Sequence, residues 1–373
     1  MKVHITLVGG QPAPVYNGIK ADNPDKVIYV YSNDKQSLKS LNSLRNEIKI
    51  EEAETLPPLS PTDPNEIENL VSYLAEKYKD DEIVVNISSG LKSWSHIFGY
   101  HFQNQENASV IYMDQNNVLW NYKTKQSSSD FNFDMFTLFR LYGNPLEKYT
   151  RLSDYNEADK EVAKKIEGIR NTNPSDFNKL LAVLEGSKKG LITNKTGKFD
   201  LPTGSYVEWI KATKDSDAFV RICLFNKKGV SEVELESPHA FELAFNSGWF
   251  EYKIASILST WKHAKDICLN CRFPFKNNID KNEVDIIVNT GTKLLFVECK
   301  TQITKPTDID KFRTVVKTYG GLGAKSLFVT DAAKSEVAKK KCEDYEIIDY
   351  SLKEGQGKIL QLLNDELEKI NAR

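Results

Sequence analysis

The most constraining feature of the sequence is a pair of apolar runs, rich in β-branched residues, on either side of a short polar turn. The first run is Val284-Asp285-Ile286-Ile287-Val288, the turn is Asn289-Thr290-Gly291-Thr292, and the second run is Leu294-Leu295-Phe296-Val297-Glu298-Cys299-Lys300. Such runs around a turn containing Asn and Gly are typical of a β-hairpin. The pattern therefore predicts two paired strands that carry Asp285 on the first and Glu298 and Lys300 on the second.

The second apolar run ends with two charged residues, Glu298 and Lys300, on either side of Cys299. Because side chains alternate faces along a strand, Glu298 and Lys300 share one face of the predicted hairpin. The residues between them are expected to pack into a core on the other face: Leu295, Val297 and Cys299. Carboxylates of Asp285 and Glu298 that converge across a hairpin would form a hard oxygen site for Mg²⁺ or Mn²⁺. A neighbouring lysine would orient or deprotonate a water for attack on phosphorus.

These features predict a metal-dependent nuclease site. The alternative for an isolated Glu-x-Lys is a solvated hairpin face with an ion pair. A helix predicted upstream favours the nuclease, because it adds a third acid. It opens at Ser247-Gly248, and its apolar positions recur at helical spacing: Phe250, Ile254, Ile257, Leu258 and Trp261. Glu251 lies at the edge of this stripe, on a face that continues through Ala255, so we expect its carboxylate to lean toward the core.

The order of elements is a helix with Glu, a strand with Asp, a strand with Glu-x-Lys and a further helix. This order resembles the PD-(D/E)xK restriction-endonuclease-like superfamily, whose pattern Glu251, Asp285, Glu298 and Lys300 match residue by residue. The chain departs from it where Val284 replaces the proline before Asp285. The resemblance implies that Asp285, Glu298 and the Cys299 backbone carbonyl ligate the metal. Glu251 would complete the site or hold a second ion, and Lys300 would position the water.

The first 125 residues alternate apolar runs with helical periodicity. Residues 3–8, 27–31, 83–87 and 110–113 are predicted to be buried parallel strands, and residues 38–48 and 67–78 are predicted to be helices. The pattern indicates a Rossmann-like α/β sheet. Ligands of such sheets bind beyond the carboxyl ends of the strands.

The residues just after each predicted strand are therefore the candidates for ligand binding. After the third strand, Ser88, Ser89 and Lys92 precede a helix whose first backbone amides point outward, and together these groups could hold a phosphate. An ordinary strand-to-helix turn with a serine cap is the alternative. No GxGxxG follows the first strand and no GxxxxGK[ST] occurs, which argues against a dinucleotide cofactor and a P-loop NTPase.

The motif Asn86-Ile87-Ser88-Ser89-Gly90-Leu91-Lys92 after an apolar strand resembles the ligand motif of CARF domains, the Rossmann-like sensors of cyclic oligoadenylates in type III CRISPR defence. Leu7-Val8-Gly9-Gly10-Gln11-Pro12-Ala13-Pro14 resembles their first-strand loop. The resemblance implies an activator, cyclic tetra-adenylate, and a homodimer. The expected ligand-binding residues are Gly9, Gly10, Gln11, Pro12, Ser32, Asn86, Ser88, Ser89, Gly90, Leu91, Lys92 and Asp114.

The two resemblances predict a two-domain α/β protein, with a CARF domain at 1–145 and a PD-(D/E)xK nuclease at 231–373. The connecting region at 146–230 is predicted to contain helices at 158–169 and 176–184 and a basic hairpin at 187–199. Basic side chains that could contact a DNA or RNA backbone are Lys188, Lys189 and Lys195 in this hairpin and Lys311 and Arg313 in a predicted helix at 308–317. A solvated surface is the alternative for each of them.

Composition limits the remaining classes. The 373 residues carry a formal charge of -2, which argues against a strongly basic nucleic-acid-binding protein. No apolar run approaches the ~18 residues of a membrane span and no signal peptide is evident, so a cytoplasmic location is expected. Five cysteines at irregular spacing fit reduced thiols. Cys268-x-x-Cys271 lacks the second ligand pair of a structural zinc site.

Two other functions remain open from the sequence. A ring nuclease or pure sensor would use the N-terminal pocket alone, but the presence of all four nuclease residues argues against it. A sequence-specific restriction enzyme would need an element that reads bases, and no helix-turn-helix or zinc finger is evident.

Overall fold

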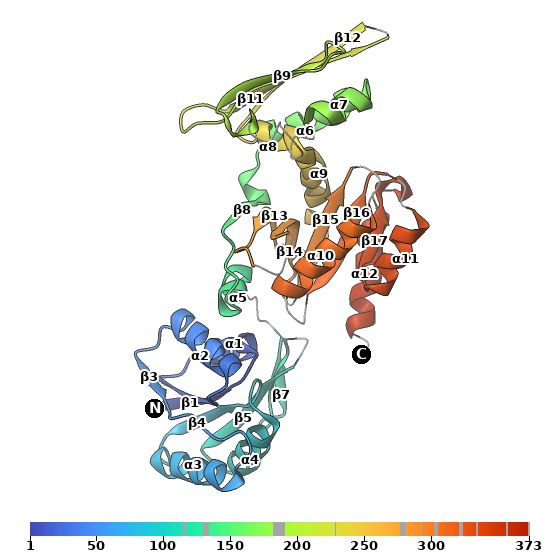
Figure 1. Cartoon of the computed structure of the whole chain (residues 1–373). Coiled ribbons are helices and arrows are strands. Elements are labelled where there is room, and N and C mark those ends of the chain that lie inside the picture. Colours follow the sequence, from blue (N-terminus) through green and yellow to red (C-terminus); the bar gives the residue numbers. More distant parts are fainter. Residues whose placement is uncertain are drawn as a thin grey trace. The chain divides into compact units, whose positions relative to one another are not determined.

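The computed structural model of the chain forms two compact units, Met1–Leu146 and Glu147–Arg373 (Figure 1). The residues that the structure describes are 1–114, 117–129, 134–181, 191–227, 229–276, 281–291, 293–301, 305–320, 324–332, 335–355 and 357–371.

The described residues of the first unit form a seven-stranded sheet of order β3-β2-β1-β4-β5-β6-β7. Its strands are β1 (Lys2–Val8), β2 (Lys26–Tyr31), β3 (Glu52–Thr55), β4 (Glu82–Asn86), β5 (Ala108–Met113), β6 (Leu119–Asn121) and β7 (Gln126–Ser128). The first five strands are parallel, and β6 and β7 continue the sheet in antiparallel pairing. The predicted Rossmann-like sheet is confirmed.

Helices cover both faces of this sheet (Figure 1). They are α1 (Pro12–Asp22), α2 (Lys35–Glu47), α3 (Pro64–Lys77), α4 (Lys92–Phe102) and α5 (Met135–Leu141). Alternate residues of β1 explain why the strands are apolar throughout. Val3, Ile5 and Leu7 pack in a cluster with α3 and α4. Val8 packs with α1 and α2 on the other face. Because helices cover both faces of the sheet, a central strand has no solvent-exposed face, and its sequence does not alternate between apolar and polar residues.

Several elements of this unit were not predicted. Helix α1 begins at Pro12, in the first turn of a helix, where the fixed φ of proline is favourable. This proline lies in the segment 7–14, which resembles a first-strand loop in its sequence. Strand β7, which pairs with β6, was not predicted either. Strands of three or four residues such as β3, β6 and β7 are too short for a periodic pattern to mark them.

The strand order places a topological switch point between β1 and β4. The chain proceeds from β1 to β2 and β3 on one side, and then returns to place β4 and β5 on the other side. The loops after β1 and β4 therefore leave neighbouring strands at the same edge and lead into α1 and α4. Crevices at such a point are where open α/β sheets bind ligands.

The second unit contains a six-stranded sheet of order β17-β16-β15-β14-β13-β8 among its described residues. Its strands are β8 (Lys148–Arg151), β13 (Asp266–Arg272), β14 (Glu283–Asn289), β15 (Leu294–Lys300), β16 (Lys325–Thr330) and β17 (Ile348–Ser351). Strands β14 and β15 are antiparallel, with Ile286 opposite Val297 and Asn289 opposite Leu294. The predicted hairpin is confirmed. Its turn residue Thr292 lies outside the described residues.

The helices of the second unit pack partly on this sheet and partly on a second sheet (Figure 1). They are α6 (Glu157–Arg170), α7 (Pro174–Leu181), α8 (Ala240–Ala244), α9 (Gly248–Ser259), α10 (Pro306–Tyr319), α11 (Glu336–Asp344) and α12 (Lys358–Asn371), with 3-10 turns η1 (Leu152–Asp154), η3 (Leu191–Thr193), η4 (Phe245–Ser247) and η5 (Leu352–Glu354). Helix α9 packs Ile254 and Leu258 into the cluster that contains Leu295, Val297 and Cys299. This packing confirms the expected core face of β15.

A separate antiparallel sheet of order β12-β11-β10-β9 precedes the six-stranded sheet's central strands in the chain. Its strands are β9 (Thr196–Asp200), β10 (Tyr206–Ile210), β11 (Ala218–Asn226) and β12 (Gly229–Ser237). The described part of the predicted basic hairpin is instead the turn η3 followed by the edge strand β9, which pairs with β10. Residues 187–190 of the predicted hairpin lie outside the described residues, so the hairpin itself stays a prediction.

None of the helices in the described residues has the length and apolar character that a membrane crossing requires.

Candidate functional site

Asp285 and Glu298 lie side by side on neighbouring strands of the second unit. Because Ile286 is opposite Val297, the next step along the hairpin brings Asp285 to Glu298 and Cys299. The Asp285 carboxylate accepts a hydrogen bond from the Cys299 backbone N–H at 2.7 Å through Oδ2. The Glu298 side chain is only 3% exposed. Two carboxylates are thus held at the end of a rigid hairpin, as the sequence predicts.

Two lysines neutralise these carboxylates. Lys300, on the same strand as Glu298, places its Nζ 2.6 Å from Oε1. Lys281, just before β14, donates to Oε1 at 2.7 Å and to Oε2 at 2.6 Å. The same Lys281 ammonium lies 3.8 Å from Oδ1 of Asp285. Burial opposes the charge of both lysines, but Glu298 and Asp285 outweigh it and raise the pKa of each. Both amines therefore stay protonated at neutral pH.

Glu251 stands on the first turn of α9, half-buried and apart from this ion-pair cluster. Burial and the nearby charge of Asp285 raise the pKa of Glu251 well above its usual range, and Lys300 and Lys281 oppose the rise. Its carboxyl group therefore interacts electrostatically with the charged groups of the cluster. Within the described ranges, no three His, Cys, Asp or Glu side chains lie close enough to hold one ion. The metal roles of Glu251 and of the Cys299 carbonyl stay predictions.

Lys281 is the member of this cluster that sequence reasoning did not single out. Only Asn282 separates it from the start of β14, so it belongs to no alternating or helical pattern. Its position four residues before Asp285 was the available signal. A long side chain at the base of a strand can reach the strand next to it, but which carboxylate it meets depends on the register of the hairpin.

In the first unit, the loops after β1 and β4 contact each other at the switch point. The backbone N–H groups of Gly9 and Gln11 both donate to Oγ of Ser89 at 3.2 Å. Ser88 hydrogen-bonds Asn86 through its own Oγ at 2.5 Å and accepts the Met113 N–H at 2.8 Å. Two loops far apart in the sequence thus contact each other at the switch point, and their role in ligand binding stays a prediction.

Gly9 tests how tightly these loops pack. A Cβ on Gly9 would collide with the carbonyl oxygen of Ser89, so Gly9→Ala should destabilise this unit by about 1–3 kcal/mol. Gly99, inside α4, has nothing within 4 Å of its Cβ position. Gly99→Ala should therefore stabilise the unit by roughly 0.5–1 kcal/mol through helix propensity. Thermal unfolding measures both variants, and equal melting temperatures would contradict the close approach of the two loops.

The remaining predicted ligand residues differ in accessibility. Lys92 is exposed and begins α4, with Leu91 as the N-cap. Ser32 is 1% exposed, and its hydroxyl donates to Asp34, the carboxylate that caps α2. Asp114 accepts hydrogen bonds from the Val118 N–H and from the Trp120 indole. The structure therefore uses Ser32 and Asp114 to hold local elements, and a role for them in ligand binding stays a prediction.

Comparison with known families matches each unit separately. The Card1 CARF domain matches residues 3–138, and the Card1-like endonuclease domain matches residues 240–366. The chain is a CARF-domain endonuclease. The endonuclease match contains Glu251, Asp285, Glu298, Lys300 and also Lys281. An endonuclease domain of this kind suggests dependence on a divalent metal ion. A comparison with curated proteins found no match.

Solved structures share the fold of the CARF-domain endonuclease at low identity. Can2 from Sulfobacillus thermosulfidooxidans, solved in complex with cyclic tetra-adenylate, has 16% identity and a TM-score of 0.66 over 98% of this chain and 99% of that one. VC1899 from Vibrio cholerae has 14% identity and a TM-score of 0.69 over 96% and 97%. A type III CRISPR defence DNA nuclease activated by cyclic oligoadenylate has 15% identity and a TM-score of 0.54 over 88% of this chain and 45% of that one.

Three of the predicted basic residues of the CARF-domain endonuclease lie in the part of the chain that the structure describes. Lys195 is exposed before β9, and Lys311 is exposed on α10. Arg313 stacks over the ring of Tyr345 at 4.0 Å, so its guanidinium is partly used inside the domain. Lys188 and Lys189 lie outside the described residues. Contacts of these side chains with nucleic acid stay predictions.

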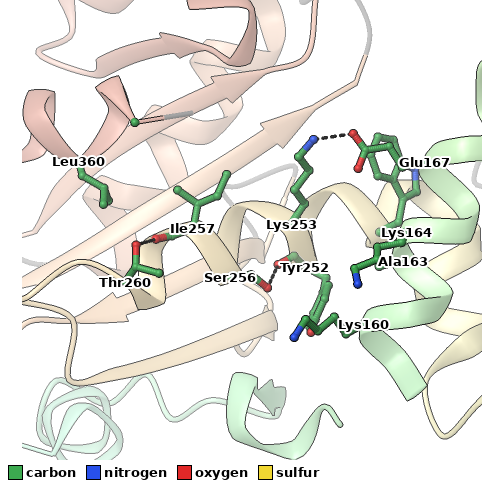
Figure 2. A pocket seen from close by; sticks show the side chains of 12 residues that line it. Lys160, Ala163, Lys164, Glu167, Tyr252, Lys253, Ser256, Ile257, Thr260 and Leu360 are labelled. Atoms are coloured by element: carbon green, nitrogen blue, oxygen red, sulfur yellow. Dashed lines mark hydrogen bonds and ion pairs between the residues drawn. The ribbon is translucent and has the colours of Figure 1, made fainter. Parts of the chain in front are cut away.

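The outer face of α9 borders a cavity of 470 Å³ (Figure 2). Trp249, Ile257 and Leu360 supply apolar walls, and three lysines stand at its rim: Lys160, Lys164 and Lys253. Each of these lysines has a carboxylate partner, respectively Glu157, Glu161 and Glu167. The cavity therefore has little net charge to attract an anion.

Histidines of the CARF-domain endonuclease have partners that spacing does not show. The Nδ1 atom of His239 lies 3.0 Å from Oδ2 of the buried Asp159, a residue far away in the sequence. This hydrogen bond raises the pKa of His239. His4 is fully buried and lies 2.7 Å from Asp22. All five cysteines lie in described ranges and none forms a disulfide, in agreement with reduced thiols.

Proposed function

We propose that a cyclic oligoadenylate, cyclic tetra-adenylate, binds the CARF domain and activates the endonuclease domain in type III CRISPR defence. The enzyme then cuts DNA or RNA with little sequence specificity. The observation that carries this proposal is the presence of a CARF domain and an endonuclease domain with the Asp285, Glu298 and Lys300 cluster in one chain. Can2, which shares the fold over nearly its full length, was solved with cyclic tetra-adenylate.

The loops at the switch point of the CARF sheet support the activator site. They bring together the Ser89 hydroxyl, which accepts from the Gly9 and Gln11 N–H groups and can still donate its own proton, and the exposed Lys92 at the start of α4. A helix N-terminus with a lysine favours phosphate. A ring of four adenylates has twofold symmetry, and two copies of one loop set across a C2 axis match that symmetry. We therefore propose a homodimer. We also propose that the chain has three parts: a CARF domain at 1–145, a connecting region at 146–230 and a nuclease domain at 231–373.

The donor atoms of the nuclease cluster fit Mg²⁺ or Mn²⁺. Oδ1 of Asp285 and Oε2 of Glu298 both face one cation already, the ammonium group of Lys281, so a positive ion is accommodated between them. Carboxylate oxygens are the donors that these ions prefer. A bound ion would polarise the phosphate and lower the pKa of an attacking water.

The protein groups around that ion have distinct roles. Asp285 is oriented by the Cys299 N–H, which holds Oδ2 and leaves Oδ1 toward the Lys281 ammonium. Lys300 stays protonated and can hold the water and offset the negative charge that develops on the phosphorane oxygens. Burial and the nearby Asp285 raise the pKa of Glu251, but a bound metal ion would favour its ionised form, so that Glu251 could complete the site or hold a second ion.

Cleavage should require both the activator and a divalent metal. Purified protein is incubated with supercoiled plasmid and with single-stranded RNA, with and without cyclic tetra-adenylate, in Mg²⁺, Mn²⁺, Ca²⁺ or EDTA. Cyclic tetra-adenylate should raise cleavage by about 5- to 150-fold, the usual range of coupling between two sites. Mn²⁺ and Mg²⁺ should support cleavage, Ca²⁺ should support little, and EDTA should abolish it.

Cyclic hexa-adenylate and linear tetra-adenylate serve as controls for the activator. Equal cleavage with and without any oligoadenylate would show that the CARF domain is not the switch, and discrete plasmid fragments would indicate a restriction enzyme instead. Degradation of cyclic tetra-adenylate without any cleavage of nucleic acid would favour a ring nuclease. Undiminished cleavage in EDTA would refute the carboxylate cluster as a metal-dependent site.

A further inference from the structure

We propose that Lys281 takes the place of a divalent metal between Asp285 and Glu298, and that metal binding requires its ammonium group to leave Oε2 of Glu298. This inference rests on the proposed nuclease function. It adds a residue outside the expected Glu251, Asp285, Glu298 and Lys300 set, and it assigns that residue a role in loading the metal.

The Lys281 ammonium lies between the carboxylate groups of Glu298 and Asp285. It contacts both oxygens of Glu298, at 2.7 and 2.6 Å, and lies 3.8 Å from Oδ1 of Asp285. The other oxygen of Asp285 is occupied by the Cys299 N–H at 2.7 Å. The two oxygens left to share one cation are thus Oε2 of Glu298 and Oδ1 of Asp285. Lys281 already occupies the place between them.

The charges of the two carboxylates and the two lysines balance one another. The Glu298 side chain is 3% exposed and that of Asp285 is 15% exposed. Two carboxylates this close and this buried repel each other unless cations compensate them. Lys281 and Lys300 supply two positive charges, so the pair is balanced without a metal. Adding a divalent ion while both lysines remain would leave a buried excess of positive charge.

Of the two lysines, Lys281 is the one that must move away when a metal binds. Lys300 belongs to β15 itself, two residues beyond Glu298, and its ammonium lies 2.6 Å from Oε1. It can keep that contact while Oε2 is given to a metal. Lys281 precedes β14 and bridges both carboxylates, so its contacts are the ones that a metal must replace. Once released, its ammonium remains close enough to the cluster to meet a substrate phosphate.

Metal affinity of a Lys281 variant tests this competition without measuring cleavage. Full-length wild type, Lys281→Met, Lys281→Arg and Lys262→Met are titrated with MnCl₂ by calorimetry, without nucleic acid or activator. Methionine keeps the apolar stem but removes the competing charge, so Lys281→Met should bind Mn²⁺ at least about tenfold more tightly. Lys281→Arg retains a cation and should stay near wild type. Lys262 is exposed after α9, so Lys262→Met controls for the lost charge.

Thermal unfolding in EDTA and in Mn²⁺ provides the second measurement. Without metal, Lys281→Met should melt below wild type, because Glu298 keeps only Lys300, and Mn²⁺ should restore it by more than it stabilises wild type. A variant that folds only with Mn²⁺ would support the inference in the same way. Equal or weaker Mn²⁺ affinity in Lys281→Met would overturn it. No Mn²⁺ binding by wild type or by any variant would instead overturn the proposed metal site itself.

Discussion

Glu298→Ala should reduce activated cleavage by at least about a thousandfold, equivalent to ~4 kcal/mol of transition-state stabilisation. Glu298 accepts hydrogen bonds from both Lys281 and Lys300 and faces Asp285 across the hairpin, so its loss removes a metal donor and releases the lysine that positions the water. Initial rates on plasmid and single-stranded RNA, with saturating activator and Mn²⁺, measure the effect. Affinity for cyclic tetra-adenylate should change by no more than a few-fold, because the CARF domain binds it.

Glu283 provides a matched control for this variant. It lies on β14, is exposed, and its carboxylate is 3.9 Å from Arg272, so Glu283→Ala removes the same charge outside the cluster. It should retain near-wild-type cleavage. Glu298→Gln preserves the shape of the side chain and should lose cleavage as well, which separates chemistry from misfolding. If folded Glu298→Ala retained more than a tenth of wild-type cleavage, Glu298 would not be an essential residue of the nuclease site.

Lys92→Ala should weaken cyclic tetra-adenylate binding by about two orders of magnitude. The Lys92 ammonium is exposed at the start of α4, beside the loop formed by Ser88 and Ser89. A charge-assisted contact to a phosphate contributes about 1.5–3 kcal/mol, and a twofold ligand loses it twice. Fluorescence anisotropy or calorimetry measures the dissociation constant. If the loss affects the active and inactive states alike, saturating activator should still restore cleavage.

Lys20 is the matched control for Lys92. It is an exposed lysine in the last turn of α1, in the same domain. Lys20→Ala removes the same charge away from the switch point, so its affinity for cyclic tetra-adenylate should remain within a few-fold of wild type. An unchanged dissociation constant for Lys92→Ala would show that the loop after β4 is not the pocket. A similar loss in both variants would indicate only a general attraction between the domain and an anionic ligand.

Much of the fold was predictable because its long elements carry local periodicity. The four apolar runs of the CARF sheet, α2 and α3, and the β14–β15 hairpin are each marked by alternation, helical spacing or turn residues. The face of β15 followed from the same rule, with Glu298 and Lys300 on one side and Val297 on the core side. Helix α1 was missed because its proline start looked like a loop, and β7 because three polar residues form no pattern.

The amino-acid sequence by itself determined the chemistry available to this protein: the two carboxylates and the lysine of a hairpin, and the serine, glycine and lysine residues that follow the CARF strands. It could do so because alternation and turn chemistry act over a few neighbouring residues.

Only the tertiary structure decided which of these groups meet. It joined Lys281 to Glu298, placed the Gly9 loop against Ser89, and paired His239 with Asp159. It also showed that Ser32 is buried in a helix cap. Such contacts depend on strand register and on packing between segments distant in the chain, which no local pattern records.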